Sequence, residues 1–341
     1  MISPPITTSP RSSPQPLCCD VRAPLLKHAS ADRRKLLLTL RHLNLIGSCT
    51  ITSVTSLLSL TTLQVLKIMY CWGITDINTI SALTKLQYLK LLNCSMTDAS
   101  SLSQLTLLRR LDLRGAFKLT DVSPLLNLTQ LEHLNLSECE SITDFSSLAA
   151  LTQLRSLTLR ESSIADVSCL AALIHLTSLN LRECGMTDVS SLSRLTRLRT
   201  LDISCCQNVS DISSLTHLTQ LKVLCMMSCK NIEDITWLAA LTRLQHLDMS
   251  FSYNIADSSS LSSLTRLQSL KLMGCRSIKD FSLSALAQLR VLEMGGCKCI
   301  TDISSLSGLS LQYLNLKGCS SVMNASISLL RKQLPHLHAD D

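Results

Sequence analysis

The sequence predicts an α/β solenoid in which about 13 stacked repeats place a parallel β-sheet on a concave side and short helical or 3-10 turns on a convex side. Two observations lead to this prediction. One phrase of 22 or 23 residues returns along the 341-residue chain, and self-similarity at a period of roughly 20–50 residues is typical of solenoids. Aromatic residues make up only 3% of the sequence and apolar residues 46%, so we expect a uniform aliphatic core.

The opening leucine of the phrase sets the number of repeats. It recurs at spacings of 22 or 23 residues, at Leu37, Leu60, Leu83, Leu105, Leu128, Leu151, Leu173, Leu195, Leu218, Leu241, Leu264, Leu286 and Leu309. The L-x-x-L-x-L pattern that follows alternates as a β-strand does, with its last two leucine positions inward and the residues between them outward. One repeat cannot bury its own apolar side, so neighbouring repeats are expected to share a continuous core.

The twelfth position of the repeat holds only small residues. It is cysteine in nine repeats, at Cys71, Cys94, Cys139, Cys184, Cys206, Cys229, Cys275, Cys297 and Cys319, and Ser48, Ala116, Ser162 or Ser252 in the others. We interpret this column as structural: the strand ends here, and the thiol donates to carbonyl groups that lack a ladder partner. The repeat spacing lacks the C-x2-C pattern of zinc sites, so no metal is expected. Thiols of adjacent repeats would come within disulfide range, which favours a reducing compartment.

An aspartate follows the small residue after four or five positions in eleven repeats: Asp76, Asp98, Asp121, Asp144, Asp166, Asp188, Asp211, Asp234, Asp257, Asp280 and Asp302. Its usual context, Asp-x-Ser-Ser-Leu, is typical of a helix N-cap, where the carboxylate accepts backbone N–H groups. The column is therefore expected to open the convex turns.

The chain divides into four segments by composition. Residues 1–20 are rich in proline, serine and threonine and are expected to be a disordered tail. Helical patterns predict an N-terminal cap at 21–36 and a C-terminal cap and tail at 326–341, on either side of a solenoid at 37–325. The first residues lack the pattern of a secretory signal, and no apolar run is long enough to insert into a membrane. A cytoplasmic location is expected, with a nuclear one as an alternative.

The concave face is expected to carry the function, because stacking aligns the outward strand residues into a broad surface. Apolar candidates for partner binding lie in the first repeats, and arginine candidates in the middle repeats: Ile46, Val65, Met69, Tyr88 and Leu92, then Arg110, Arg114, Arg160 and Arg182. Each group has an alternative interpretation. The N-terminal cap could cover the apolar patch, and the arginines could form a solvated charge ladder with the intervening acids.

Other kinds of chemistry find little support. Phosphate-binding glycine motifs are absent, histidines are scattered, and the net charge of +7 comes without a long basic run. We therefore expect no enzyme activity, no cofactor and no nucleic-acid partner.

With L-T-x-L-x-x-L-x-L, a small residue and I-T-D-[IV]-S-x-L, residues 37 to about 330 resemble the 22-residue class of leucine-rich repeats, found in bacterial internalins and a phosphatase regulatory subunit. This resemblance implies a leucine-rich-repeat horseshoe. Cysteine at the usual asparagine position, as in Gly274-Cys275, is also similar to F-box receptors and, most closely, to trypanosomatid proteins labelled putative adenylate cyclase regulators. An F-box or RING-type array is absent from the 36 residues before the repeats.

The resemblance and the concave face together predict a monomeric, non-enzymatic scaffold or regulatory subunit that binds another protein. A substrate-recognition subunit of a ubiquitin ligase and an extracellular adhesin of the internalin kind are the alternatives.

Overall fold

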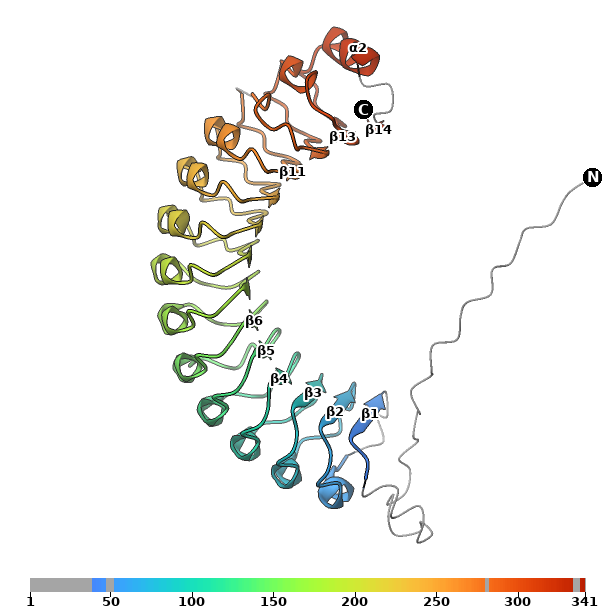
Figure 1. Ribbon diagram of the computed structural model, residues 1–341, viewed down its shortest axis with the longest axis vertical. Helices are drawn as coiled ribbons and strands as arrows, with labels where there is room; N and C mark the ends of the chain where they lie inside the picture. Colours follow the sequence, from blue (N-terminus) through green and yellow to red (C-terminus); the bar gives the residue numbers. More distant parts are fainter. Residues whose placement is uncertain (1–38, 47–51, 280–281, 334–337, 341) are drawn as a thin grey trace, which may run out of the picture.

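The computed structural model describes residues 39–46, 52–279, 282–333 and 338–340. These residues form a curved solenoid with strands along its inner wall and short turns along its outer wall (Figure 1). The fold class predicted from the repeat is thus confirmed. The tail expected at 1–20 and the cap expected at 21–36 lie outside the described residues.

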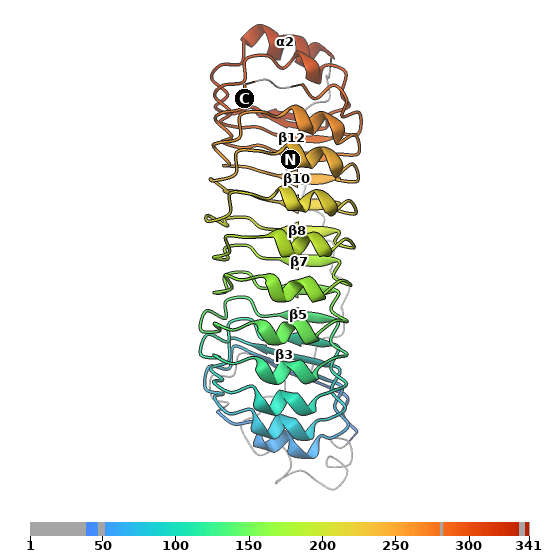
Figure 2. The same ribbon diagram turned by 90° about the vertical axis from the view of Figure 1, so that its left-hand side faces the viewer.

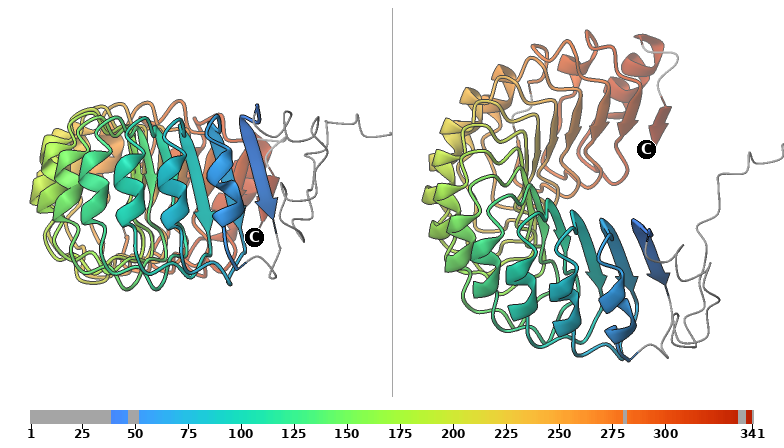
Figure 3. Two further views of the ribbon diagram at one scale, coloured as in Figure 1. Left: turned by 90° about the horizontal axis from the view of Figure 1, so that it is seen from below. Right: turned by 60° about the horizontal axis from the view of Figure 1, so that its bottom comes forward.

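The inner wall is one parallel sheet whose strands follow chain order (Figure 3). Its strands are β1 His42–Ile46, β2 Val65–Met69, β3 Tyr88–Leu92, β4 Arg110–Asp112, β5 His133–Asn135, β6 Ser156–Thr158, β7 Ser178–Asn180, β8 Thr200–Asp202, β9 Val223–Cys225, β10 His246–Asp248, β11 Ser269–Lys271, β12 Val291–Glu293, β13 Tyr313–Asn315 and β14 His338–Asp340. Pairing keeps the repeat register, since Leu66, Leu89 and Leu111 are partners on successive strands. Equivalent outward residues consequently form straight columns across the sheet.

The convex wall is a stack of 3-10 helices (Figure 2). They are η1 Thr55–Ser59, η2 Asn78–Ala82, η3 Ser100–Gln104, η4 Ser123–Asn127, η5 Ser146–Ala150, η6 Ser168–Ala172, η7 Ser190–Arg194, η8 Ser213–His217, η9 Thr236–Ala240, η10 Ser259–Ser263 and η11 Ser304–Leu306. Neighbouring strands lie about 4.8 Å apart, whereas the axes of packed helices lie further apart, at about 8–10 Å. The outer wall is therefore longer than the inner one, and the array curves.

After the last repeat the chain forms α2 Asn324–Gln333, and β14 then pairs with β13. Leu330 of α2 is buried and Ile327 packs against the end of the core. The C-terminal cap and tail were expected at 326–341; the helix begins two residues before that range and ends at Gln333. The addition of β14 to the sheet had no counterpart in the repeat pattern.

The interior is one continuous aliphatic cluster from Leu43 to Leu330. Both inward leucine positions of the strands are buried along the array, as Leu179 and Leu181 illustrate. Burial of each such side chain contributes about 1.5–3 kcal/mol, and each repeat contributes only to its neighbours. Stability therefore accumulates repeat by repeat.

Strands β2 to β13 are each followed by a sharp turn at the residue before the small column. Twelve residues there have φ between 52° and 77°, namely Tyr70, Asn93, Gly115, Glu138, Glu161, Glu183, Cys205, Ser228, Phe251, Gly274, Gly296 and Gly318. This left-handed conformation favours glycine and asparagine and strains larger residues. The strained side chains are held pointing away from the core at one edge of the sheet.

Candidate functional site: the concave face and its edges

Three columns of outward side chains cover the concave face. The first column contains Val65, Tyr88, Arg110, His133 and Ser156, at the start of each strand; the second contains Lys67, Lys90, Asp112, Asn135 and Thr158; and the third contains Ile46, Met69, Leu92, Arg114 and their equivalents, at the strand ends. In-register pairing makes residues of one column direct neighbours.

The third column is less apolar at its surface than the sequence predicted. Ile46 is 46% exposed and Met69 is half-buried, but Leu92 is only 8% exposed. Leu92 lies between Met69 on β2 and Arg114 after β4, and strands about 4.8 Å apart leave little solvent between such long side chains. The expectation of Leu92 as an exposed contact residue is therefore wrong, whereas Ile46 remains accessible.

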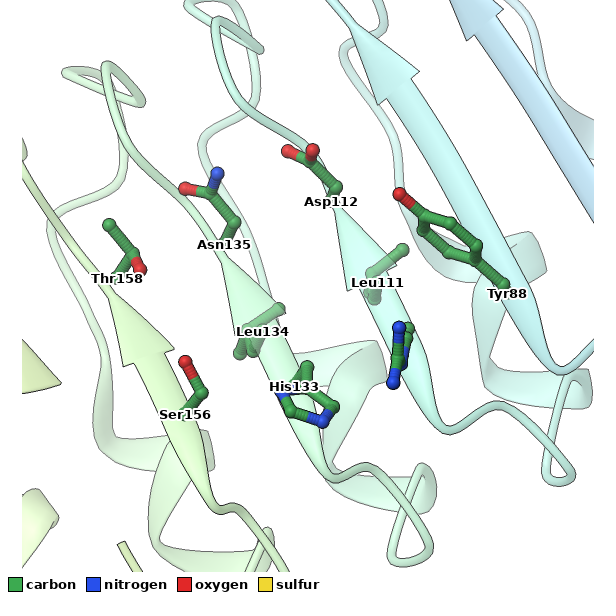
Figure 4. A pocket seen from close by; sticks show the side chains of 9 residues that line it. Tyr88, Leu111, Asp112, His133, Leu134, Asn135, Ser156 and Thr158 are labelled. Carbon is green, nitrogen blue, oxygen red and sulfur yellow. The ribbon is translucent and has the colours of Figure 1, made fainter. Parts of the chain in front are cut away.

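A shallow hollow lies over β3 to β6 on the concave face (Figure 4). Its lining includes the first residues of β3, β4 and β5, which are Tyr88, Arg110 and His133, and the last residues of β4 and β5, which are Asp112 and Asn135. Two residues that the sequence singled out, Tyr88 and Arg110, are register partners here. The structure adds His133, one of the histidines that are scattered in the sequence.

Electrostatics favours the neutral imidazole of His133. Burial and then the positive charge of Arg110 lower the pKa of His133, and Glu132 opposes the shift in part. Arg110 itself is exposed and, among the described residues, has no carboxylate within ion-pair distance. The hollow therefore offers an uncommitted guanidinium beside an aromatic ring and a neutral imidazole.

The other predicted arginines are committed to neighbouring acids. Arg114 donates from Nε and Nη2 to Glu138 Oε1 over 3.0 and 2.7 Å. Arg182 donates to Glu183 over 2.9 Å, and Arg160 and Glu161 form a further pair. Exposed pairs of this kind contribute only about 0–1 kcal/mol. The geometry is that of the charge ladder that the sequence left as an alternative.

Acids and amides of the second column serve the backbone. Oδ1 of the residue at the strand end accepts the N–H two residues later, as in Arg114 to Asp112, Ser137 to Asn135, Arg182 to Asn180, Ser204 to Asp202, Ser250 to Asp248 and Lys317 to Asn315. These side chains satisfy donors released where the strand ends. They are less available for a ligand than their exposure alone implies.

Sequence reasoning missed an aromatic cluster at the edge where the strands end. Tyr70, Trp72 and Phe117 are 46%, 47% and 38% exposed, and the rings of Trp72 and Phe117 lie 6.0 Å apart between centroids. The rings meet across the repeat between them, whose loop is one residue shorter. A signal was present: aromatics are rare in this chain, and Trp72 and Phe117 each follow the small column directly.

The cysteine column is buried and hydrogen-bonded to the preceding repeat. Cys206 Sγ donates to the Leu181 carbonyl over 3.1 Å, and the same geometry recurs in six other cysteines: Cys139, Cys184, Cys229, Cys275, Cys297 and Cys319. The acceptor differs from our expectation, because the Leu181 carbonyl already accepts the Cys184 N–H. The thiol is a second donor to it. Among the described residues the cysteines are free thiols, and burial raises the pKa of Cys206 to about 12.

The aspartates of this column lie one residue before the N-cap position of the 3-10 helices, not at the N-cap itself. Asp211 Oδ1 accepts the N–H of Ser213, the first residue of η8, over 2.8 Å, while Ile212 occupies the cap position. The contact recurs at Asp76, Asp98, Asp121, Asp144, Asp166, Asp188, Asp234, Asp257 and Asp302. Asp280 lies outside the described residues. The carboxylates thus form Asx turns that start the helices.

The described residues also lack the features of a metal site and of a membrane span. They contain no group of three or more His, Cys, Asp or Glu side chains placed to hold a metal ion. Within the same ranges, the helices are too short or too polar to cross a bilayer.

Fold and surface together define a solenoid repeat protein with an open concave sheet. A family model described as a leucine-rich repeat region matches residues 118–339, and the chain belongs to the leucine-rich-repeat family. The internalin InlF of Listeria monocytogenes is similar, at 30% identity and a TM-score of 0.81 over 90% of this chain and 88% of that one. No curated protein sequence matches the chain.

Two more distant structures share the fold. A leucine-rich-repeat protein of Leptospira interrogans is 18% identical, with a TM-score of 0.64 over 92% of both chains. The functional domain of InlJ from Listeria monocytogenes, described as including a cysteine ladder, is 22% identical, with a TM-score of 0.53 over 82% of this chain and 68% of that one.

Proposed function

We propose that this chain is a non-enzymatic scaffold or regulatory subunit that binds another protein through its concave face. The observation that carries the proposal is the hollow lined by Tyr88, Arg110 and His133. Among the described residues, the Arg110 guanidinium has no carboxylate within ion-pair distance. Tyrosine and arginine are enriched among residues that dominate binding energy at protein interfaces. Leucine-rich-repeat proteins are generally binding scaffolds, which supports the same class.

The contact surface extends from this hollow to the first repeats in our proposal. Ile46 and the edge cluster of Tyr70, Trp72 and Phe117 supply exposed apolar area beside it. Exposed apolar patches of this size next to polar groups often mark partner sites. Arg114, Arg160 and Arg182 contribute less, because each already pairs with a glutamate.

The proposed setting is a reducing compartment such as the cytoplasm, with the chain acting as a monomer. Support comes from the stacked free thiols, which an oxidising environment would expose to disulfide formation. A regulatory role like that of the trypanosomatid proteins is a finer proposal, and it rests on the cysteine column.

An extracellular protein of the internalin kind is the second candidate. The similarity to the Listeria internalin in fold and sequence favours it. The localisation of the full-length tagged protein separates the two candidates, because only the first requires the thiols to be reduced in the cell.

Proximity labelling tests the proposed surface. The wild-type chain is compared with an Ile46→Asp/Arg110→Glu variant and with a Lys317→Glu control on the same face near the C-terminal end. We expect partner proteins to be lost from the double variant and kept by the control. Equal labelling by all three chains, each folded by circular dichroism, would remove the concave face from the proposal.

A further inference from the structure

Positive charge is segregated at one rim of the sheet. Seven segments of the chain lead into strands β6 to β12, and we refer to them together as the amino edge. They are residues 151–156, 173–178, 195–200, 218–223, 241–246, 264–269 and 286–291. These segments contain seven lysines and arginines and no aspartate or glutamate: Arg155, Arg197, Arg199, Lys222, Arg243, Arg266 and Arg290. All strands run in the same direction, so these segments form one continuous rim (Figure 3).

A hollow with a basic lining lies on this rim. Arg155, Arg197 and Arg199 converge on it together with His175 and Thr177. Among the described residues, the carboxylate that approaches these arginines is Glu132, 3.8 Å from Arg155 Nε. Arg197 Nη1 lies 2.9 Å from His175 Nδ1 instead.

The arginines of the amino edge have fewer carboxylate partners than the arginines of the third column. Arg114, Arg160 and Arg182 each have a glutamate partner, whereas Arg243 on the amino edge donates to the neutral Gln220 over 2.6 Å. Arg290 is tied to backbone carbonyls and is not part of the argument. Three guanidinium groups that converge on one hollow, with Glu132 the one carboxylate near them among the described residues, favour an anionic group from outside. They can bind such a group in bidentate fashion.

The rim also indicates what kind of anion fits it. Neighbouring segments of the rim lie about 4.8 Å apart, and all of them except 173–178 carry a lysine or arginine. This spacing suits an extended chain bearing several charges. Single-stranded nucleic acids are typically held by aromatic side chains that stack on the bases. The amino edge contains no phenylalanine, tyrosine or tryptophan, so a segment rich in carboxylates fits it better.

We propose that the amino edge binds an acidic segment of a protein partner, anchored at Arg155, Arg197 and Arg199. This inference rests on the proposed function, because it names the chemistry of the partner that a binding scaffold would take. It adds a second contact region, on the rim of the sheet, to the hollow at Tyr88 and Arg110. Lys222, Arg243 and Arg266 extend the contact along the later repeats.

Titration of the purified full chain with labelled hexaglutamate tests the proposal, with hexaglutamine and hexauridylate as comparison probes. An Arg155→Gln/Arg197→Gln/Arg199→Gln variant is matched by a Lys118→Gln/Lys230→Gln/Lys298→Gln variant. The matched variant removes the same charge from exposed lysines beyond the strand ends. We expect hexaglutamate to bind, hexaglutamine not to bind, and the arginine variant to lose about tenfold in affinity. The lysine variant should keep nearly all of it.

Three results would overturn the proposal: equal losses in both variants, tighter binding of hexauridylate than of hexaglutamate, or no hexaglutamate binding at low salt. Equal losses would mean that net charge alone attracts the probe. None of them touches the proposed function, which depends on proximity labelling through Ile46 and Arg110. Persistent labelling without hexaglutamate binding would retain the scaffold and reject the acidic segment.

Discussion

The Cys206 thiol lies 3.1 Å from the carbonyl oxygen of Leu181, one repeat earlier in the chain, and donates its hydrogen to it. The same carbonyl accepts the backbone N–H of Cys184. One small side chain thus joins the turn of one repeat to the strand end of the repeat before it. In the repeat that has Ser252 instead, the hydroxyl donates to Met226 over 3.2 Å.

The loss in free energy of unfolding on substitution of Cys206 is expected to depend on two properties of the new side chain: its volume, and whether it can donate a hydrogen bond. Cys206→Ser should change the free energy of unfolding least, because Ser252 makes the equivalent contact. Cys206→Ala loses a second donor from an acceptor that keeps one partner, at about 1 kcal/mol. Cys206→Leu overfills a position with 0% exposure and should cost about 1–3 kcal/mol or more. Urea unfolding measures the series, and an alanine variant as costly as leucine would contradict the ranking.

Acid should weaken the solenoid through its aspartate column. Backbone and then side-chain hydrogen bonds from the following serine lower the pKa of Asp98, Asp144, Asp166, Asp211, Asp257 and Asp302. As pH falls below the unfolded value of about 3.9, the unfolded chain takes up protons first. The stability that these groups contribute is therefore full above that value and is lost as pH falls through the folded pKa.

A series of urea unfolding curves between neutral pH and pH 3 measures this effect. Replacing Asp144, Asp211 and Asp302 with asparagine keeps an acceptor for the Asx turn but removes the titration. The acid-induced loss of stability should be smaller in that variant. An unchanged pH profile would show that other groups cause the acid sensitivity.

The repeat pattern was sufficient to predict the fold, because each position of the repeat has the same structural role in successive copies. Inward leucines such as Leu179 are buried in every repeat, and the period alone fixes their face. The partner surface was harder to predict. Alternation marks Leu92 as outward, but its burial depends on the length of Met69 and Arg114 in adjacent repeats.

Contacts between repeats explain the other misses. Trp72 and Phe117 are 45 residues apart in sequence numbering and meet only because the shortened repeat between them brings them together. The uncommitted state of Arg110, in contrast to Arg114, likewise depends on which acids lie within reach across the sheet. A residue pattern within one repeat does not contain that information.

The pKa of His133 should respond to Arg110. In the wild type, the imidazole is expected to titrate below about 6.5 by NMR, because burial and Arg110 both disfavour its protonated form. Arg110→Met should raise the midpoint, yet leave it below the ordinary value, since burial is the larger cause. Arg182→Met lies several strands away and is the control. A midpoint unaffected by Arg110→Met would contradict the electrostatic coupling of the two side chains across the hollow.

Alanine substitutions at three glycines distinguish the stability cost of backbone strain from that of steric crowding. Gly185 has open space at its Cβ position; Gly296 has φ of +77° with its nearest neighbour at 3.6 Å; and Gly274 has φ of +69° and would place a Cβ 2.7 Å from Phe251. Gly185→Ala should be nearly neutral. Gly296→Ala should cost about 1–2 kcal/mol from the left-handed conformation alone, and Gly274→Ala more. Equal unfolding midpoints for the Gly296 and Gly274 variants would mean that Phe251 moves aside freely.

Ile46 and Leu92 belong to one column but should respond differently to a charge. Leu92→Asp places a carboxylate where only 8% of the side chain meets solvent, and a buried, unpaired charge is among the most destabilising substitutions, at about 3 kcal/mol or more. Ile46→Asp puts the same group at a position that is 46% exposed, where surface changes usually stay within about 0.5 kcal/mol.

Urea unfolding of the two aspartate variants checks this contrast, with Leu92→Met as a volume-conserving control that should remain close to wild type. Similar losses in both aspartate variants would show that the first strand is covered as deeply as the third. The contrast also decides how binding at this face is tested. A loss of partner capture in Leu92→Asp could follow from unfolding of the neighbouring repeats, whereas the same loss in Ile46→Asp, at unchanged stability, identifies a contact.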